Sequence, residues 1–68
     1  MSNFSENVRK FRLEKGLSQA ELGKMINVCQ VVIHDYEIAK ITPKPDTFVR
    51  LAKALGTTCE ELVFGQTE

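Results

Sequence analysis

The chain has 68 residues, of which 43% are hydrophobic and 26% charged, and its formal net charge is zero. This length allows one compact domain and no second one, so we expect residues 1–68 to form a single unit with its core at 4–65 and a short tail at 66–68. The sequence contains no apolar run long enough to span a bilayer and no signal-peptide pattern, which predicts a cytoplasmic protein that does not bind membranes.

The first half of the chain predicts two helices, and nothing in it alternates with the period of a strand. We expect the first helix at residues 4–15, with Asn3 in a capping box at its start and Gly16 as its stop. The second begins at the capping box Ser18-Gln19-Ala20-Glu21, in which a Ser hydroxyl and a Glu carboxylate satisfy each other's backbone N–H groups. This helix is expected to continue to Ile26.

The second half predicts three more helices. Asn27 interrupts the pattern, and Asn is the residue other than Gly that best adopts a left-handed conformation. Helices then follow at 29–37, at 46–55 with Gly56 as its stop, and at 58–64 behind another capping box. The sequence therefore predicts an all-α fold of five short helices.

Residues 19–38 have the pattern of two helices that cross at a tight turn. Such a pair needs a small residue where the helices cross, which is Gly23, and a left-handed residue in the turn, which is Asn27. It also needs apolar residues on the shared inner side, and these are Leu22, Ile26, Val28, Ile33 and Tyr36.

Three segments in register resemble one known family. Gly16-Leu17-Ser18-Gln19-Ala20-Glu21-Leu22 is similar to the GLSQxEL signature of the Xre/Cro-type helix-turn-helix family, which includes lambdoid phage repressors. Leu51-Ala52-Lys53-Ala54-Leu55-Gly56 and Glu60-Glu61-Leu62 resemble its C-terminal half. The resemblance spans residues 4–65 and implies a five-helix, lambda-repressor-like DNA-binding domain.

The resemblance also implies roles for individual residues. The helix at 29–37 would be the recognition helix in the DNA major groove. Its implied base contacts are Gln30, Val31, His34 and Asp35. The implied phosphate contacts are Gln19, Lys40, Thr42 and Lys44. By the same alignment Gln19 would brace Gln30, and Arg12 would pair with Glu37 to tie the first helix to the third.

Several residues depart from the family pattern. Asn27 and Ala39 stand where Gly is usual, and a left-handed Ala39 would be strained. Cys29 replaces the usual Ser or Thr cap, which weakens the start of the helix by about 1 kcal/mol. The carboxylate of Asp35 would be repelled by phosphate, so it must face a base donor such as a cytosine amino group or a neighbouring cation.

The charges and cysteines leave alternatives open. Residues 1–53 hold nine basic and six acidic residues, a balance of +3, and residues 54–68 hold three acidic residues, a balance of −3. A basic face turned away from an acidic C-terminal part would still attract phosphate. Cys29 is expected to replace a serine or, alternatively, to sense redox state, and Cys59 to be half-buried. His34 is either an ordinary surface residue or a DNA contact, and we expect no metal site.

We therefore expect a sequence-specific transcriptional regulator that binds a palindromic operator as a homodimer, with no cofactor, no small-molecule substrate and no enzymatic activity. The expected dimer interface comprises Ile38, Ile41, Val63 and Phe64. The alternative is an antitoxin-like or coregulator helix-turn-helix module whose main partner is another protein. An enzyme is the weakest reading, because the sequence has no nucleophile–base pair, metal cluster or Gly-rich phosphate loop.

Overall fold

The structure is a computed structural model that describes residues 4–65, and the described residues form five α-helices and no strand. In chain order the helices are α1 (Phe4–Glu14), α2 (Gln19–Ile26), α3 (Gln30–Glu37), α4 (Pro45–Ala54) and α5 (Cys59–Phe64). The all-α expectation is confirmed. The expected cap at Asn3 and the tail at 66–68 lie outside the described residues. None of the described helices is long and apolar enough to cross a membrane.

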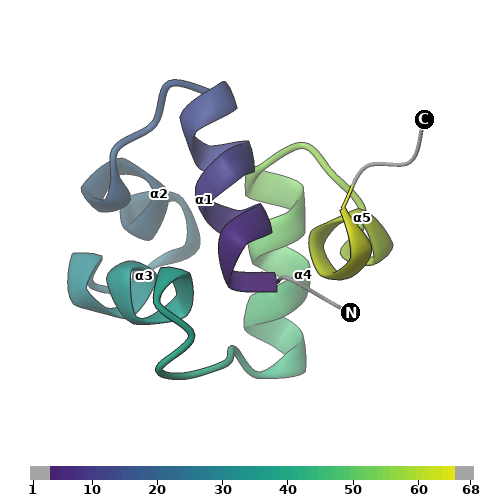
Figure 1. The fold of residues 1–68 in the computed structure, drawn as a ribbon. Helices are drawn as coiled ribbons and strands as arrows, with labels where there is room; N and C mark the ends of the chain where they lie inside the picture. The colour runs from purple at the N-terminus through teal and green to yellow at the C-terminus, as the bar shows by residue number, and fades with distance from the viewer. Residues whose placement is uncertain (1–3, 66–68) are drawn as a thin grey trace.

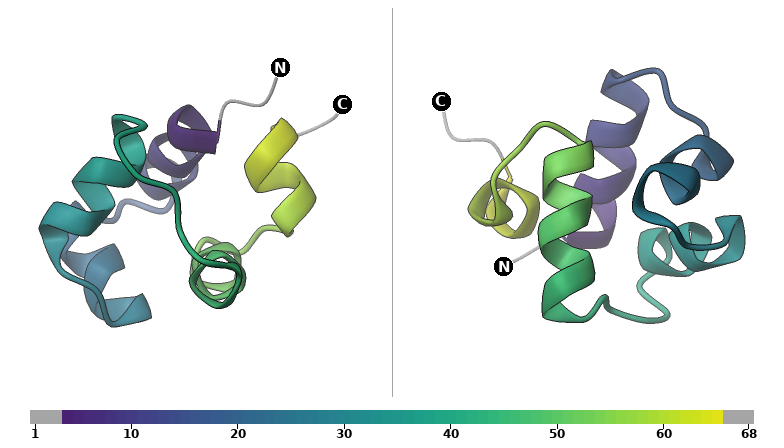
Figure 2. Two further views of the ribbon diagram at one scale, coloured as in Figure 1. Left: turned by 90° about the horizontal axis from the view of Figure 1, so that it is seen from below. Right: turned by 180° about the vertical axis from the view of Figure 1, so that it is seen from behind.

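The helices are arranged around α1. In Figure 1, α2 and α3 lie on one side of α1, α5 lies on the other, and α4 runs behind it. α1 packs on α3 and α5, while α4 packs on α2 and α5. Figure 2 shows the loop after α3 running across one end of the bundle to reach α4. The pair α2–α3 is therefore supported from behind and keeps one side open to solvent.

All five helices contribute to one hydrophobic core. The buried hydrophobic residues are Val8, Phe11, Leu22, Ile26, Ile33, Tyr36, Leu51, Ala52, Leu55 and Leu62. Val28, which was predicted to face inward, is half-buried, and so is Phe48. The ring of Phe4 stacks on Phe48 with centroids 5.2 Å apart, so the start of α1 covers the first half of α4. Burial of this kind stabilises the fold by about 25 cal/mol per Å² of apolar surface.

Both predicted capping boxes on α2 and α5 are confirmed. At α2, Glu21 N–H donates to Ser18 Oγ at 3.0 Å, and Ser18 N–H donates to Glu21 Oε1 at 2.8 Å. At α5, Thr58 Oγ1 accepts from Glu61 N–H at 3.0 Å. The backbone N–H of Thr58, which donates to the Glu61 carboxylate, is the largest cause that lowers the pKa of Glu61 below its ordinary value.

Other helix boundaries differ from expectation by one residue. α4 begins at Pro45 rather than Asp46, because proline fits the first helical position, where no N–H is needed. Cys29 precedes α3 as its N-cap and forms no side-chain cap hydrogen bond, as its weak capping ability predicted. The expectation that Cys59 is half-buried is wrong: it is exposed, because the first turn of α5 faces solvent.

Four helices end in the same left-handed turn. The residues with positive φ just after α1, α2, α3 and α4 are Gly16 (70°), Asn27 (64°), Ala39 (61°) and Gly56 (68°). In each turn the next N–H donates to a carbonyl five residues earlier, as Lys40 N–H does to Asp35 O at 2.9 Å. This is the Schellman motif, which satisfies carbonyls that the helix end leaves free. Ala39 is the one apolar residue with a Cβ among the four.

Candidate nucleic-acid interface

α3 crosses α2 where Gly23 leaves room for it. Gly23 is buried, and a Cβ placed on it would lie 2.6 Å from the carbonyl oxygen of Val28. Val28 N–H donates to Gly23 O at 2.8 Å, which closes the turn between the helices. The backbone of Val28 fills the space beside Gly23, so only a residue without a side chain fits at this point. The two helices therefore cross at Gly23 and turn at the left-handed Asn27, as the sequence predicted.

α3 has one buried and one open side. Ile33 and Tyr36 point into the core. Gln30 is exposed, Val31 is 66% exposed, and the side chain of His34 is 55% exposed. Asp35, the fourth predicted base contact, is more covered, with 19% of its side chain exposed. Positions three and four residues apart share a helix face. His34 is three residues from Val31 and four from Gln30, so three of the four candidates lie together on the open side of α3.

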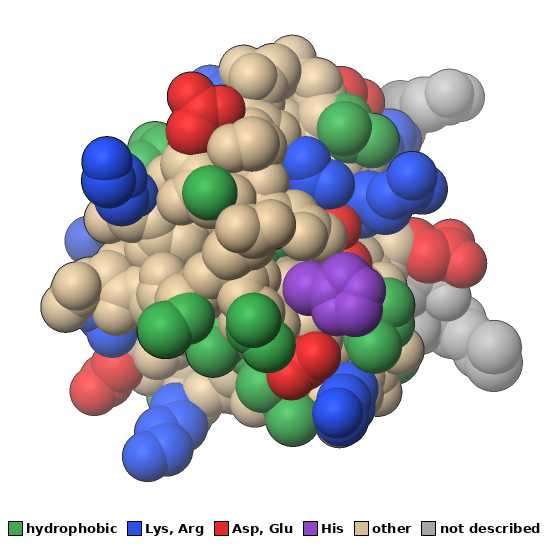
Figure 3. All heavy atoms as spheres, turned by 90° about the vertical axis from the view of Figure 1, so that its left-hand side faces the viewer, with side chains coloured by type: hydrophobic (Ala, Val, Ile, Leu, Met, Phe, Trp, Pro, Cys, Tyr) green, Lys and Arg blue, Asp and Glu red, His purple; other side chains and the backbone are tan. Residues whose placement is uncertain are grey.

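Figure 3 views the molecule from the side on which α2 and α3 lie. Hydrophobic side chains and the single histidine occupy the middle and lower part of this face, and Lys and Arg side chains lie at several points around them. Acidic side chains lie between the basic ones. The face therefore combines an apolar and polar centre with a rim that carries both basic and acidic side chains.

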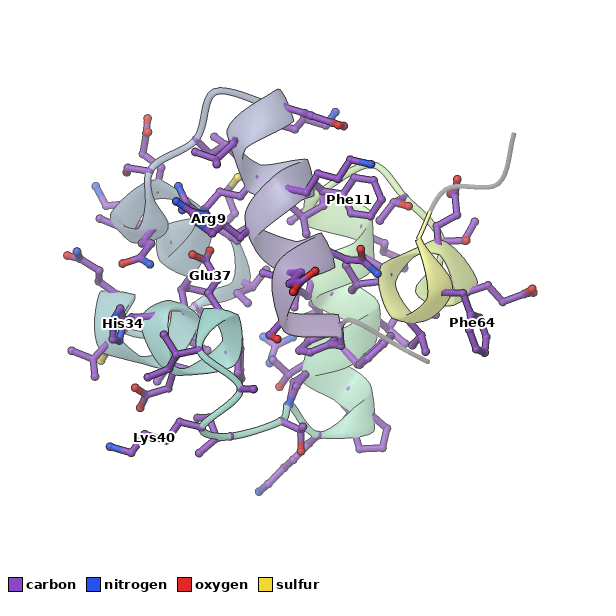
Figure 4. The ribbon with its side chains drawn as sticks, in the orientation of Figure 1. Arg9, Phe11, His34, Glu37, Lys40 and Phe64 are labelled. Atoms are coloured by element: carbon purple, nitrogen blue, oxygen red, sulfur yellow. The ribbon has the colours of Figure 1, made fainter. Side chains whose placement is uncertain are left out.

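The predicted phosphate contacts lie in two places. Lys40, Thr42 and Lys44 are exposed in the segment that links α3 to α4, and Figure 4 shows Lys40 extending into solvent from this segment. Gln19 is half-buried at the first position of α2. Free N–H groups at a helix N-terminus attract anions, so the position of Gln19 suits a phosphate.

A network of hydrogen bonds behind this face ties three helices together. Arg12 of α1 donates twice to Glu37 of α3, from Nε to Oε2 at 2.6 Å and from Nη2 to Oε1 at 3.1 Å. Arg12 Nη1 also donates to Leu17 O at 2.8 Å. The two charged side chains are 9% and 4% exposed. The Arg–Glu pair implied by the resemblance is confirmed, and its geometry is bidentate.

Gln19 belongs to the same network. Its Nε2 donates to Glu37 Oε1 at 3.1 Å, so among the described residues the Gln19 amide is held by Glu37 rather than by Gln30. The expectation that Gln19 braces Gln30 does not describe this structure. The hydrogen bond from Gln19 to Glu37 therefore joins the first residue of α2 to the last residue of α3.

Two side chains outside the predicted set make notable contacts, Arg9 beside this region and Asn7 on the side of α1 that packs on α5. Arg9 is exposed on α1, on the side toward α2 and α3 in Figure 4, and it lines a shallow depression together with Leu13 and Glu37. The sequence could have indicated Arg9, because it is a basic residue three positions before Arg12 on the same helix. Asn7 is buried and donates to Leu62 O at 2.9 Å, tying α1 to α5. No sequence motif indicated that bond.

The predicted dimer residues do not form one patch. Ile38 and Ile41, which flank Lys40 in the chain, are 54% and 42% exposed. Phe64 of α5 is 72% exposed, and Figure 4 shows it on the opposite side of the molecule from Lys40. Its neighbour Val63 is half-buried. The described residues also contain no cluster of three or more side chains able to hold a metal ion.

A helix-turn-helix family model matches residues 8–62, which is most of the chain and includes the whole α2–α3 pair. The chain belongs to the Xre/Cro-type helix-turn-helix family. It is also 41% identical over 49 residues to Multiprotein-bridging factor 1c of Arabidopsis thaliana, a match that covers 72% of this chain. The chain spans only 33% of the length of that relative.

Solved structures share the same fold. The P22 c2 repressor in complex with synthetic operator 9T superposes with a TM-score of 0.90 at 30% identity, over 97% of this chain and 100% of the repressor chain. The restriction-modification controller protein C.AhdI from Aeromonas hydrophila gives a TM-score of 0.82 at 27% identity, covering 87% of this chain and 89% of the controller. The lambda-repressor-like architecture is therefore confirmed.

Proposed function

We propose that this chain is a sequence-specific transcriptional regulator that binds a palindromic operator as a homodimer, with α3 in the major groove. The observation that carries the proposal is the open face of α3, where Gln30, Val31 and His34 are exposed while the opposite side is buried. The repressor of TM-score 0.90 is itself bound to an operator, which supports the same use of this surface.

The roles follow from side-chain chemistry. A Gln amide pairs with adenine in bidentate fashion, and a Val side chain contacts the methyl group of thymine, so we assign base contacts to Gln30 and Val31. Lys40, Thr42 and Lys44 contact backbone phosphate from the loop, as Gln19 does from the start of α2. Arg9 is added to this set, because it is exposed beside the recognition face.

The experiment begins with selection of binding sites from random double-stranded DNA. We expect a palindrome whose half-sites lie one helical turn apart, about 34 Å. Binding of the selected duplex is then measured by fluorescence anisotropy at two salt concentrations. With about six to ten phosphate contacts, affinity should fall by roughly 10³–10⁵ between about 50 and 200 mM salt.

The variant Gln30→Ala tests the recognition helix. It should lose about 1–3 kcal/mol of discrimination at one position of each half-site and keep the circular dichroism of the folded chain. Cys59→Ser is the matched control, because Cys59 is exposed at the start of α5, across the bundle from α3. If Gln30→Ala binds the selected site as selectively as the control does, the assignment of α3 is wrong.

Of the four residues predicted for the dimer interface, we choose Ile38 and Ile41 as the proposed contact. These residues directly follow α3, so a two-fold contact there brings both recognition helices onto one face of the duplex. Light scattering at micromolar concentration should show a dimer that Ile41→Asp dissociates. The companion variant Phe64→Asp distinguishes the two apolar patches: loss of the dimer in that variant instead would move the interface to α5.

A second candidate function is that of a coregulator or antitoxin-like module whose main partner is a protein. The observation that favours it is the 41% identity to a protein named as a multiprotein-bridging factor. Under this function, selection from random DNA enriches no sequence. The chain then binds DNA only nonspecifically, with an affinity that falls as the salt concentration rises.

A further inference from the structure

Two neighbouring side chains beside the open face of α3 form a close pair. His34 Nδ1 lies 3.6 Å from Asp35 Oδ1, so the two side chains carry opposite charges whenever the imidazole is protonated. Both were predicted to contact bases separately. What the pair does at DNA rests on the proposed function, since it concerns the same surface.

The exposure of the two side chains differs in a way that assigns them different roles. The side chain of His34 is 55% exposed and that of Asp35 is 19% exposed. A ligand that approaches the open side of α3 therefore meets the imidazole before the carboxylate. DNA carries about one negative charge per 1.7 Å of duplex, so a carboxylate without a cation beside it would be repelled there.

No Lys or Arg nitrogen of a described residue lies within 4.0 Å of the Asp35 carboxylate. Figure 4 shows Arg9 of α1 above His34 and Lys40 of the following loop below it, and Figure 3 shows basic side chains both above and below the histidine. No acidic oxygen of a described residue other than that of Asp35 lies within 4.0 Å of the His34 ring nitrogens. α1 and α2 pack on α3, and among their other charged groups Arg12 pairs with Glu37 and Glu21 accepts from Ser18 N–H. The remaining ones are exposed and form no ion pair with a described residue: Glu6, Lys10, Glu14 and Lys24.

We infer that Asp35 is a positioning residue that acts through His34: its carboxylate holds the protonated imidazole toward an acceptor on the DNA, and the pair enters the interface as a neutral unit. His34 then donates to DNA, and Asp35 contacts the imidazole rather than a base. This assignment also answers how an acidic residue is accommodated on a recognition helix.

The pair makes DNA binding depend on pH. Histidine changes charge between about pH 5 and 8, and the proposed contact uses the charged form. Binding therefore takes up a proton, and affinity rises as the pH falls through this range.

The experiment measures binding of the full chain to its selected duplex at about pH 5.5 and about pH 8, at constant ionic strength. The wild type should bind roughly tenfold more tightly per protomer at the lower pH, because a hydrogen bond from a charged donor is stronger than one from a neutral donor. Because His34 is the only histidine in the chain, His34→Gln should remove this difference. Lys40→Gln is the matched control: it lowers affinity by the same factor at both pH values, since lysine does not titrate in this range.

Asp35→Asn separates the inference from direct base recognition. If Asp35 acts through His34, the variant binds more tightly than the wild type at about pH 8, shows a smaller pH effect, and keeps its base preference. Loss of affinity with a changed preference at one base pair would overturn the inference, because Asp35 would then read a base. A wild type whose binding is independent of pH overturns it too. Failure of the chain to select any DNA at either pH refutes the proposed function as well.

Discussion

Replacing Ala39 by glycine should stabilise the protein. Ala39 has φ of 61° in the Schellman turn that ends α3, a conformation in which the Cβ of an L-residue approaches the following carbonyl oxygen. Three of the described helices end in the same turn with glycine or asparagine, so the backbone geometry there is imposed by the motif rather than by the side chain. Glycine at position 39 would therefore adopt the same left-handed conformation without the steric strain of the Cβ.

The magnitude follows from two opposing terms. Left-handed geometry costs an L-residue roughly 1–2 kcal/mol, which Ala39→Gly recovers. Glycine also gains freedom in the unfolded chain, which opposes this by about 0.4–1 kcal/mol. The net increase in the free energy of unfolding is about 1 kcal/mol, or a rise of about 4–8 °C in Tm for a domain of this size.

The assay is thermal and urea unfolding followed by circular dichroism, with Gly16→Ala as the reverse variant. A Cβ added to Gly16, which has φ of +70°, meets no atom within 4 Å, so this variant measures the conformational cost without any steric contact. We expect it to lose about as much stability as Ala39→Gly gains. An Ala39→Gly variant no more stable than the wild type, beside a destabilised Gly16→Ala, would refute the reasoning.

Three further predictions concern stability. Gly23→Ala places a Cβ 2.6 Å from Val28 O, a backbone atom that cannot move alone, and should lower the free energy of unfolding by about 1–3 kcal/mol or more in a urea titration. Arg12→Met leaves the carboxylate of Glu37 buried without its cation and should cost about 3–5 kcal/mol, with Glu37→Gln in the same chain restoring part of it. The pKa of Glu61 is lowered in the folded chain, so its stabilising contribution is complete above its unfolded value of 4.5 and is lost as the pH falls through the folded value. Unfolding measured from neutral pH to about pH 3 should therefore show a smaller acid-induced loss in Glu61→Gln; an unchanged loss would contradict this cause.

The parts of the fold that depend on neighbours in the chain were predictable from the sequence. Both capping boxes and the left-handed Asn27 involve atoms three to five residues apart, and each was expected at its residue. The crossing at Gly23 was also predictable, because the turn between α2 and α3 is short and brings α3 back across α2 at a nearby residue. The family resemblance then located the open face of α3 with Gln30 on it.

Contacts between residues far apart in the chain required the tertiary structure. The bond from Asn7 to Leu62 O joins positions 55 residues apart, and no local pattern determines which carbonyl a buried amide meets. The partner of Gln19 was predicted as Gln30 and is Glu37, because packing of α1 against α3 brings the Arg12 pair to the start of α2.

The open face of α3 shows the same division. Amino-acid sequence and helical period determined that Gln30, Val31 and His34 share a side, because residues three and four positions apart on a helix are neighbours. Only the packed structure decided that Asp35 is largely covered beside His34, and that Phe64 lies across the molecule from Ile38 and Ile41. Exposure depends on which neighbouring helices cover a side chain, and that is a property of the whole bundle.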